Sequence, residues 1–483
     1  MLGIELQRKS SVSLSRQLYM EFVGRIADGR LKSGEALPST RELAVELGVS
    51  RNTVCEAYEM LMAEEYIVSR QGAPTRVAHG IGPNIRSVIP GIGPGSPDVR
   101  NGRIETGNGV KNLGSGRPAE VDFHTGRPDL KAFPMQRWLK LMYRTSSLLK
   151  PEQWGYTDLE GFLPLREEIA RWLLRSRGIN AAPYEIFITA GTTHALHILS
   201  EILFEPPFEI LAEDPCHLGM LRAMKIRGYS VVSRPVDEHG LMTSQLGSSM
   251  SRLIYVTPSH QFPLGGILPA NRRSELIRYA ARNNAYIIED DYDSEFRYGG
   301  PPVAPLHTMD PGRVIYAGTF SKILFPGLRI GYIILPGELQ DRWRYMRLHS
   351  DVQNPLFEQA ALAEFMRSRQ FDRHLGKMRK LYGQRRKILL DALKAEFGTV
   401  PQYWGDAAGL HLAVSFPGSI FNRRFERHCR LNGLIVQTAD RHCINKGAHN
   451  DKLLLGYGHL EPEDIRKGTS LLRACIESWH GKN

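Results

Sequence analysis

The sequence predicts a multidomain protein, with a small helical N-terminal domain, a linker and a larger α/β domain whose sheet is mostly parallel. Three observations lead to this prediction. The chain of 483 residues is too long for one hydrophobic core. Residues 79–120 are rich in Gly, Pro, Asn and Ser, and bury too little apolar surface to offset the entropy of ordering. From residue 121 onward, short β-branched runs alternate with longer helical patterns. We therefore expect domains at 11–78 and 121–483, joined by a flexible linker over 79–120.

The composition argues against several classes of protein. Hydrophobic residues make up 42% and charged residues 23% of the chain, as in soluble globular proteins. No apolar run approaches the ~20 residues needed to span a bilayer, and the N-terminus lacks the apolar stretch of a signal peptide. The five cysteines show no metal-site spacing, which favours a reducing compartment. We expect a cytoplasmic protein without a metal site or membrane contact.

The net charge of the chain does not show which part of it binds a partner. A net charge of +11 is compatible with nucleic-acid binding. Residues 1–80, however, contain ten Lys/Arg and ten Asp/Glu, so this part is neutral overall. A nucleic-acid contact must therefore be inferred from motifs.

Residues 11–78 show the pattern of three helices followed by a hairpin. One face of a helix over 14–27 is marked by apolar residues four apart, namely Leu14, Leu18, Phe22 and Ile26. Ser39 or Thr40 can cap a second helix that Gly48 ends, and Ser50 can cap a third. The third helix is expected to bury Val54, Ala57, Tyr58, Leu61 and Met62. Two short helices joined by a Gly-containing turn predict a helix-turn-helix, with YIVSRQGAPTRVA as a hairpin wing.

The second helix of this motif begins with residues suited to DNA. In a helix-turn-helix these positions enter the major groove, so Arg51, Asn52 and Thr53 could reach base edges or phosphates. Arg76 in the wing also suits a phosphate contact. The set expected to bind double-stranded DNA is Ser39, Thr40, Arg41, Ser50, Arg51, Asn52, Thr53 and Arg70. A small helical domain with solvated arginines is the alternative.

PSTRELAVELGVSRNTV followed by AYEML resembles the winged helix-turn-helix of the GntR family of bacterial repressors. The resemblance covers roughly residues 13–77 and implies operator DNA as a partner. Two departures concern the wing. Glu65 stands where the family usually has a glycine, and Ala73-Pro74 interrupts a tip usually made of small residues.

Three segments of the C-terminal domain carry chemistry. In residues 316–332, YAGTFSKILFPGLRIGY, a predicted strand is followed by a hydroxyl-rich turn that contains a lysine, Lys322. A lysine that forms a Schiff base needs a nearby phosphate anchor, and donors for it are Thr319, Ser321, Arg329 and the amides of Gly191, Thr192 and Thr193. AYIIEDDYDSEF ends a buried strand in carboxylates, one of which could pair with a pyridinium nitrogen.

In this order and spacing, the three segments resemble the fold-type I pyridoxal-phosphate aminotransferases, from about Asp122 to about Ile476. The resemblance implies that Lys322 is the cofactor lysine, that Asp290 pairs with the pyridine nitrogen and that Tyr292 lies near the phenolic oxygen. It makes Gly191, Thr192, Thr319, Ser321 and Arg329 phosphate contacts. Tyr156 matches a tyrosine that reaches the cofactor of a neighbouring subunit, which implies a homodimer. His217 occupies the place of a stacking aromatic ring, although a partly buried polar histidine fits as well.

A GntR-like head on an aminotransferase-like body resembles the MocR subfamily of bacterial regulators. TPSHQFPLGG, EDDYDSEFRYGG and FHTGRPDLKAFP are similar to segments of that subfamily. The resemblance implies a dimer that binds operator DNA and senses pyridoxal 5'-phosphate, an amine effector or both through an aldimine at Lys322. No catalytic residue is expected, although a transaminase half-reaction could remain.

Two positions depart from an aminotransferase. Leu454 falls where a carboxylate-binding arginine is expected, and leucine cannot hold a carboxylate in a planar bidentate pair. The usual Asn-Pro reads Phe262-Pro263, with Gln261 and His260 as possible replacements. We therefore expect an effector that lacks a carboxylate, binds it elsewhere, or is the cofactor itself. The competing hypotheses are an active aminotransferase with an accessory DNA-binding domain, and a DNA-binding protein whose body has lost the cofactor.

Overall fold

The computed structural model describes residues 4, 6–8, 13–64, 66–69, 73–78, 119–156, 158–247, 251–299, 303–405 and 407–480. The chain divides into two compact units, Met1–Thr106 and Gly107–Asn483, each described here by itself. Residues 79–118 of the predicted linker lie outside the described residues. Across the ranges given above, no helix has both the length and the apolar character needed to cross a membrane.

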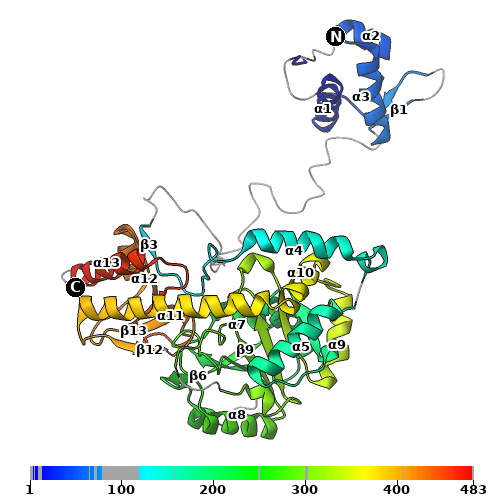
Figure 1. Ribbon diagram of the computed structural model, residues 1–483. Helices are drawn as coiled ribbons and strands as arrows, with labels where there is room; N and C mark the ends of the chain where they lie inside the picture. The colour runs from blue at the N-terminus through cyan, green and yellow to red at the C-terminus, as the bar shows by residue number, and fades with distance from the viewer. Residues whose placement is uncertain are drawn as a thin grey trace. The chain divides into compact units, whose positions relative to one another are not determined.

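The N-terminal unit contains three helices and a two-stranded hairpin (Figure 1). Its elements are α1 (Leu14–Ala27), α2 (Thr40–Leu47), α3 (Arg51–Ala63), β1 (Ile67–Val68) and β2 (Arg76–Val77). Local chemistry sets the helix ends. Ser39 and Glu42 form a reciprocal capping box at the start of α2, Gly48 ends α2 in the left-handed region at φ 61°, and the Ser50 hydroxyl accepts a bond from the Thr53 amide. The predicted helix-turn-helix with a wing is confirmed.

The core of this unit follows the predicted apolar faces with one exception. Leu18, Phe22 and Ile26 are fully buried, and α3 buries Val54, Ala57, Tyr58 and Leu61. Met62 is 38% exposed, so its expected burial is wrong. Met62 lies about 100° around the helix from Leu61, at the edge of the buried stripe.

The C-terminal unit is built on an eight-stranded sheet in the order β4-β11-β10-β9-β8-β5-β6-β7. The strands, in that order, are Ile186–Thr189, Gly331–Ile334, Val314–Thr319, Tyr286–Asp291, Leu253–Val256, Glu209–Asp214, Ser230–Asp237 and Gly240–Leu241. β11 is antiparallel to both neighbours and β7 is antiparallel to β6, whereas the other neighbouring pairs are parallel. The predicted mostly parallel sheet is therefore confirmed.

Helices cover both faces of this sheet because its buried strands are apolar on both sides. Alternate residues of β4 show the division, since Ile186 and Ile188 belong to one cluster and Phe187 to the other. The first face packs against α4 (Met135–Leu148), α5 (Leu163–Arg177), α8 (Ala270–Arg282), α10 (Leu356–Arg367) and α11 (Gln370–Phe397). The second packs against α6 (Thr192–Ile202), α7 (Leu218–Arg227) and α9 (Gly337–Leu348).

A smaller antiparallel sheet, ordered β12-β13-β16-β15, forms the C-terminal part of the unit. Its elements are β12 (Gln402–Trp404), β13 (His411–Ser415), α12 (Arg423–Leu431), β15 (Gln437–Thr438), β16 (Lys452–Gly456) and α13 (Pro462–His480). β14 (Leu434–Ile435) pairs in parallel with β3 (Val121–Asp122), so the first strand of the unit lies beside its C-terminal part. The long helix α11 runs along both parts of the unit (Figure 1). Short 3-10 helices occur at Pro151–Trp154, Pro183–Glu185, Thr243–Gln245, Leu306–Thr308, Pro326–Leu328 and Ala439–His442.

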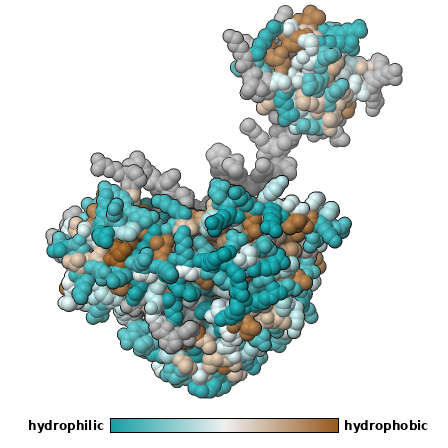
Figure 2. Space-filling view, in the orientation of Figure 1, coloured by the Kyte–Doolittle hydropathy of each residue, from teal (hydrophilic) through white to brown (hydrophobic). Residues whose placement is uncertain are grey.

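The visible surface of the C-terminal unit is mostly hydrophilic, with apolar side chains in scattered places (Figure 2). The polar groups that concern function lie inside. In a parallel sheet the carboxyl ends of the strands meet at one edge, where ligands bind in this class of fold. Here that edge gathers the ends of β4, β9 and β10, which deliver Gly191, Asp290 and Thr319.

Candidate cofactor and DNA sites

A cavity of about 300 Å³ lies at the carboxyl ends of the parallel strands. Nine of the ten residues predicted to hold a cofactor line it. They are Gly191, Thr192, His217, Asp290, Tyr292, Thr319, Ser321, Lys322 and Arg329. Tyr156 does not line it and is 88% exposed.

Lys322 reaches the cavity from the turn after β10. Its ammonium group donates a 2.7 Å hydrogen bond to the carbonyl of Gly126. Burial lowers the pKa of Lys322, while the carboxylates of Asp293 and Asp290 act in the opposite direction. A lowered pKa raises the fraction of neutral amine, which is the form that attacks a carbonyl carbon. Gly126 has φ +70°, a conformation that favours glycine, and a Cβ there would stand 2.9 Å from the lysine Nζ, so the lysine would have to shift.

One end of the cavity is a cradle of hydrogen-bond donors. Gly191 is the N-cap of α6, so the first amides of that helix face the cavity with the positive end of its dipole. Thr319 and Ser321 lie across from it, with 3.1 Å between their hydroxyl oxygens. Arg329 donates to the carbonyl of Ala190, and a Cβ on Gly191 would stand 3.2 Å from the Arg329 guanidinium. The cradle therefore has the chemistry of a phosphate site.

The opposite end of the cavity presents a buried carboxyl group with one unused oxygen. The Tyr255 hydroxyl donates a 2.7 Å bond to Oδ2 of Asp290. Oδ1 of Asp290 is buried and has no hydrogen-bond partner among the residues described. Burial raises the pKa of Asp290 to about 7. A buried oxygen without a partner is costly, so the site is complementary to a cationic N–H donor such as a pyridinium nitrogen.

Tyr292 lines the cavity, and a hydrogen bond to His260 fixes the direction of its hydroxyl group. It donates a 2.9 Å bond to the backbone carbonyl of His260, whose Nδ1 lies 2.8 Å from Oδ1 of Asp293. His260 and Gln261, considered as replacements for the usual asparagine, do not line the cavity. Gln261 donates instead to the carbonyls of Pro215 and Phe262. His260 therefore acts on the cavity through Tyr292.

A group of neutral rings forms the rest of the wall. Phe262 contacts His217, His411 and His442, with ring centroids 5.2, 5.6 and 5.0 Å apart. Burial lowers the pKa of His217 and of His411 to about 4, and that of His442 further, so all three are neutral at pH 7. Nδ1 of His217 and Nε2 of His442 are buried without a partner in the described part of the chain.

The position expected to carry a carboxylate-binding arginine does not reach this cavity. Leu454 is fully buried in β16 and packs in a separate apolar cluster with Val236, Leu264, Ala413 and Ala439. Among the described residues that line the cavity, the cationic side chains are Lys322 and Arg329. Arg329 belongs to the donor cradle, so the described lining residues offer no further guanidinium for a carboxylate.

Sequence reasoning missed several lining residues, including Gly126, Tyr255, Thr257, His411 and His442. They come from separate segments of the chain. Tyr255 lies in β8 and Thr257 follows directly after it, but no pattern in the sequence showed that the Tyr255 hydroxyl would reach Asp290. Glycine or histidine alone carries no comparable signal.

In the N-terminal unit, the predicted DNA contacts cluster at the starts of α2 and α3. Arg41, Arg51 and Asn52 are exposed, and Nε of Arg51 lies 3.5 Å from the Thr40 hydroxyl. Ser39, Ser50 and Thr53 are engaged in caps. Arg76 donates to the carbonyl of Gly34 at 2.9 Å, which holds the base of the wing. Arg70 and Glu65 lie outside the described residues, and Ala73-Pro74 is exposed.

Comparisons with known proteins found matches for both units of the chain. Residues 14–77 match the family model "Bacterial regulatory proteins, gntR family", and residues 119–418 match "Aminotransferase class I and II". An archaeal alanine:glyoxylate aminotransferase superposes with a TM-score of 0.70 at 26% identity, over 74% of this chain and 91% of that chain. LysN, the α-aminoadipate aminotransferase of Thermus thermophilus, gives 0.69 at 24%, over 75% and 94%. Its structure contains N-(5'-phosphopyridoxyl)-L-leucine.

Full-length relatives carry both units. The probable rhizopine catabolism regulatory protein MocR of Rhizobium meliloti is 34% identical over 98% of this chain and 95% of its own. The pyridoxine biosynthesis regulator PdxR of Corynebacterium glutamicum is 33% identical over 81% of each chain. TauR of Rhodobacter capsulatus is 29% identical over 96% of each.

A GntR-type DNA-binding domain joined to a domain with the aminotransferase fold defines a class of transcriptional regulators. The relatives above that match across both units are named as regulators and not as enzymes, although the larger unit has an enzyme's fold. The chain belongs to the MocR type of GntR-family regulators.

Proposed function

We propose that this regulator binds pyridoxal 5'-phosphate in the cavity at Lys322, and that an amine effector binding there changes its affinity for operator DNA. The observation that carries the proposal is the arrangement of three groups in one cavity. These are the Lys322 amine, the donor cradle around Arg329, and the buried, unpartnered Oδ1 of Asp290. Together they match an aldehyde, a phosphate and a pyridinium nitrogen.

The chain's own residues would hold the cofactor as follows. The amides at the start of α6, the hydroxyls of Thr319 and Ser321, and Arg329 would bind the phosphate. Asp290, held by Tyr255, would accept from the ring nitrogen. His217 lies at the wall beside Phe262, where an imidazole ring could stack on the cofactor. When bound, pyridoxal phosphate supplies an aldehyde carbon that condenses with primary amines. Lys322, with its lowered pKa, provides the competing amine of the protein.

The cavity favours an effector without a carboxylate. The neutral imidazoles of His217 and His442, which line the cavity, each have one buried nitrogen without a partner among the described residues, and a neutral imidazole suits hydroxyl groups better than anions. Among the described residues that line the cavity, a carboxylate placed there would meet no guanidinium other than Arg329, which the phosphate cradle uses. We infer a hydroxylated amine, such as an amino sugar, as the effector class, with the cofactor alone as the second option.

We further propose that the regulator works as a homodimer. The residues around Tyr156 expose apolar side chains that a subunit interface could cover, namely Met135, Leu139, Tyr143, Leu148, Trp154 and Leu163. Tyr156 stands among them at 88% exposure, which suits a residue that contacts a neighbouring subunit. We propose the domain limits 11–78, 79–120 and 121–483, and a cytoplasmic location, where operator DNA is found.

The DNA contacts are proposed from the exposed ends of α2 and α3. Arg51 and Asn52 stand at the first turn of α3, where side chains reach base edges. Arg41 and the amides capped by Ser39 are placed for phosphates, with Thr40, Ser50 and Thr53 beside them. Arg70 completes the proposed set from the wing.

Absorbance spectroscopy tests the cofactor proposal. Adding pyridoxal phosphate to the full chain should give a visible band that is lost in Lys322→Ala and kept in Lys380→Ala, a control at an exposed lysine of α11. A protein that stays colourless in excess cofactor would contradict the proposal. Multiple turnovers with amines and 2-oxo acids, at roughly 1–10³ s⁻¹, would instead support the aminotransferase hypothesis.

A further inference from the structure

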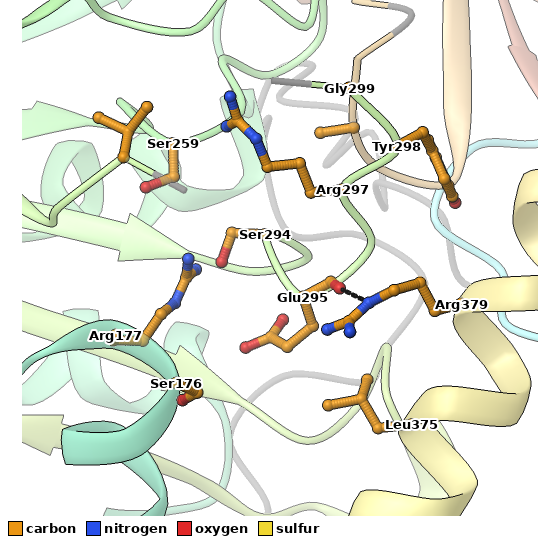
Figure 3. Close-up of a pocket in the computed structure, with 12 residues that line it drawn as sticks. Ser176, Arg177, Ser259, Ser294, Glu295, Arg297, Tyr298, Gly299, Leu375 and Arg379 are labelled. Atoms are coloured by element: carbon orange, nitrogen blue, oxygen red, sulfur yellow. Dashed lines mark hydrogen bonds between the residues drawn. The ribbon is translucent and has the colours of Figure 1, made fainter. Parts of the chain in front are cut away.

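A second cavity, of about 310 Å³, lies on the other face of β9 from the cofactor cavity. Consecutive residues of a strand point to opposite faces. Asp290 accordingly lines the cofactor cavity, whereas Asp291 pairs with Arg177, which lines the second cavity. The walls come from the end of α5, the segment after β9, and α11 (Figure 3).

Three arginines line this cavity. Arg177 and Arg379 approach from opposite sides, and Arg297 extends across the top toward Ser259 (Figure 3). Arg379 donates a 2.9 Å bond from Nε to the backbone carbonyl of Glu295, which leaves the rest of its guanidinium for other partners. The pKa of Arg297 is lowered by burial and by the neighbouring Arg177 cation, as expected where like charges are held close together.

The acidic groups nearby offset only part of this charge. Asp291 forms a buried ion pair with Arg177, with 1% and 9% of the two side chains exposed. The carboxyl group of Glu295 lies between Arg177 and Arg379 (Figure 3). Burial, with repulsion from Asp291, raises its pKa to about 7, so that near pH 7 a large part is uncharged. The lining therefore keeps a net positive charge.

Two donors at this cavity are buried and unused. Nε of Arg177 and the hydroxyl of Ser259 have no hydrogen-bond partner within the described ranges. Ser259 is 7% exposed and the side chain of Arg177 is 9% exposed. A buried donor without an acceptor destabilises the fold, and a ligand with acceptor oxygens would remove that cost.

We propose that this second cavity binds a small oxyanion, a metabolite carrying carboxylate or phosphate groups, between Arg177, Arg297 and Arg379. Cavity size, positive charge and unused donors are all consistent with a compact anion. A volume of about 310 Å³ is at the small end of ligand pockets, which span roughly 300–1,000 Å³. This site is separate from the phosphate cradle at Arg329 and does not depend on cofactor binding.

Sulfate is the probe, because it stays a dianion across the pH range of interest. Isothermal titration calorimetry of the full chain at constant ionic strength should show saturable binding. Arg297→Gln and Arg379→Gln should each weaken it about tenfold or more, the usual effect of removing a charge-assisted hydrogen bond. Lys380→Gln removes the same charge from an exposed position outside the cavity and should leave the affinity unchanged.

The Glu295→Gln variant should bind sulfate more tightly, the opposite of the effect expected for the arginine variants. The charged groups that act on the Glu295 carboxyl are Asp291, Asp293 and Arg177, and Arg379 lies beside it (Figure 3). With a pKa of about 7, Glu295 is mostly ionised at pH 8 and opposes an anion, so the glutamine variant should bind sulfate about tenfold more tightly there. At pH 6 the two proteins should bind alike.

Two outcomes would overturn the proposal. One is sulfate affinity that is unchanged in both arginine variants, with circular dichroism showing that they are folded. The other is binding that Arg329→Gln abolishes while Arg297→Gln does not affect it, since this would place the anion in the cofactor cavity.

Discussion

Replacing Asp290 with asparagine should stabilise the cofactor-free protein and weaken its hold on pyridoxal phosphate. The pKa of this carboxyl is about 7 in the fold, compared with an ordinary value of 3.8, and burial is the main cause. Above pH 7 its ionisation therefore costs the folded state about 4 kcal/mol, at about 1.4 kcal/mol per pKa unit. The cost is absent below about pH 4 and grows as the pH rises to 7. Asparagine removes it and can still accept the hydrogen bond from Tyr255.

The same substitution removes the charged acceptor for a pyridinium nitrogen. A hydrogen bond to a charged group contributes about 1.5–3 kcal/mol, so the cofactor should bind roughly 10- to 150-fold more weakly. Calorimetric unfolding of the cofactor-free protein at pH 5 and pH 8 measures the first effect, and absorbance titration measures the second. Asp291→Asn is the matched comparison. It leaves buried Arg177 without its partner and should destabilise the fold by about 3–5 kcal/mol. If Asp290→Asn binds the cofactor as the wild type does, or lowers stability at pH 8, the assigned role of Asp290 is wrong.

Three further predictions concern other parts of the chain. Arg51→Ala should weaken operator binding by about 1–3 kcal/mol in a mobility-shift titration. The control variant Arg16→Ala, on α1, should bind as the wild type does. If Arg51→Ala also binds the operator with the wild-type affinity, Arg51 is not part of the interface. Gly48→Ala should lower the free energy of unfolding of the N-terminal unit by about 1–2 kcal/mol, because Gly48 has φ 61° and a residue with a Cβ is strained there. An unchanged thermal unfolding curve would contradict this prediction. The C-terminal unit should lose stability as the pH falls from about 6.5 to 4, because His217 and His411 are held neutral by burial and their protonation favours the unfolded chain. His411→Gln should flatten that dependence in urea unfolding, and an unchanged slope would refute it.

The parts of the molecule that follow local rules could be predicted from the sequence. Ser39 and Ser50 cap helices through the backbone amide three residues further on, and Gly48 supplies a left-handed turn, so each can be identified from a few letters. Lys322 and Arg329 lie in one motif, and Asp290 ends a recognisable buried strand. The cavity therefore contains nearly all the residues expected of it.

The parts that depend on tertiary packing could not be predicted. Tyr255 reaches Asp290 from a neighbouring strand, and His442 comes from a 3-10 helix more than a hundred residues later. Gly126 matters only because Lys322 packs against it. Arg76 stays a predicted phosphate contact, but the bond from its guanidinium to the carbonyl of Gly34, 42 residues earlier, could not be predicted. Leu454 was compared with a catalytic arginine by its place in the chain, whereas its side chain packs into another apolar cluster.

Operator binding measured with and without cofactor and amine tests the central claim most directly. In a fluorescence anisotropy titration of labelled operator DNA, pyridoxal phosphate, or the cofactor with a hydroxylated amine, should change the affinity of the wild-type protein by about fivefold or more. Lys322→Ala should bind the operator with one affinity under all of these conditions, and Lys380→Ala should behave as the wild type does. Equal shifts in wild type and Lys322→Ala, or no shift in either, would contradict the proposal that the cavity at Lys322 controls the DNA-binding unit.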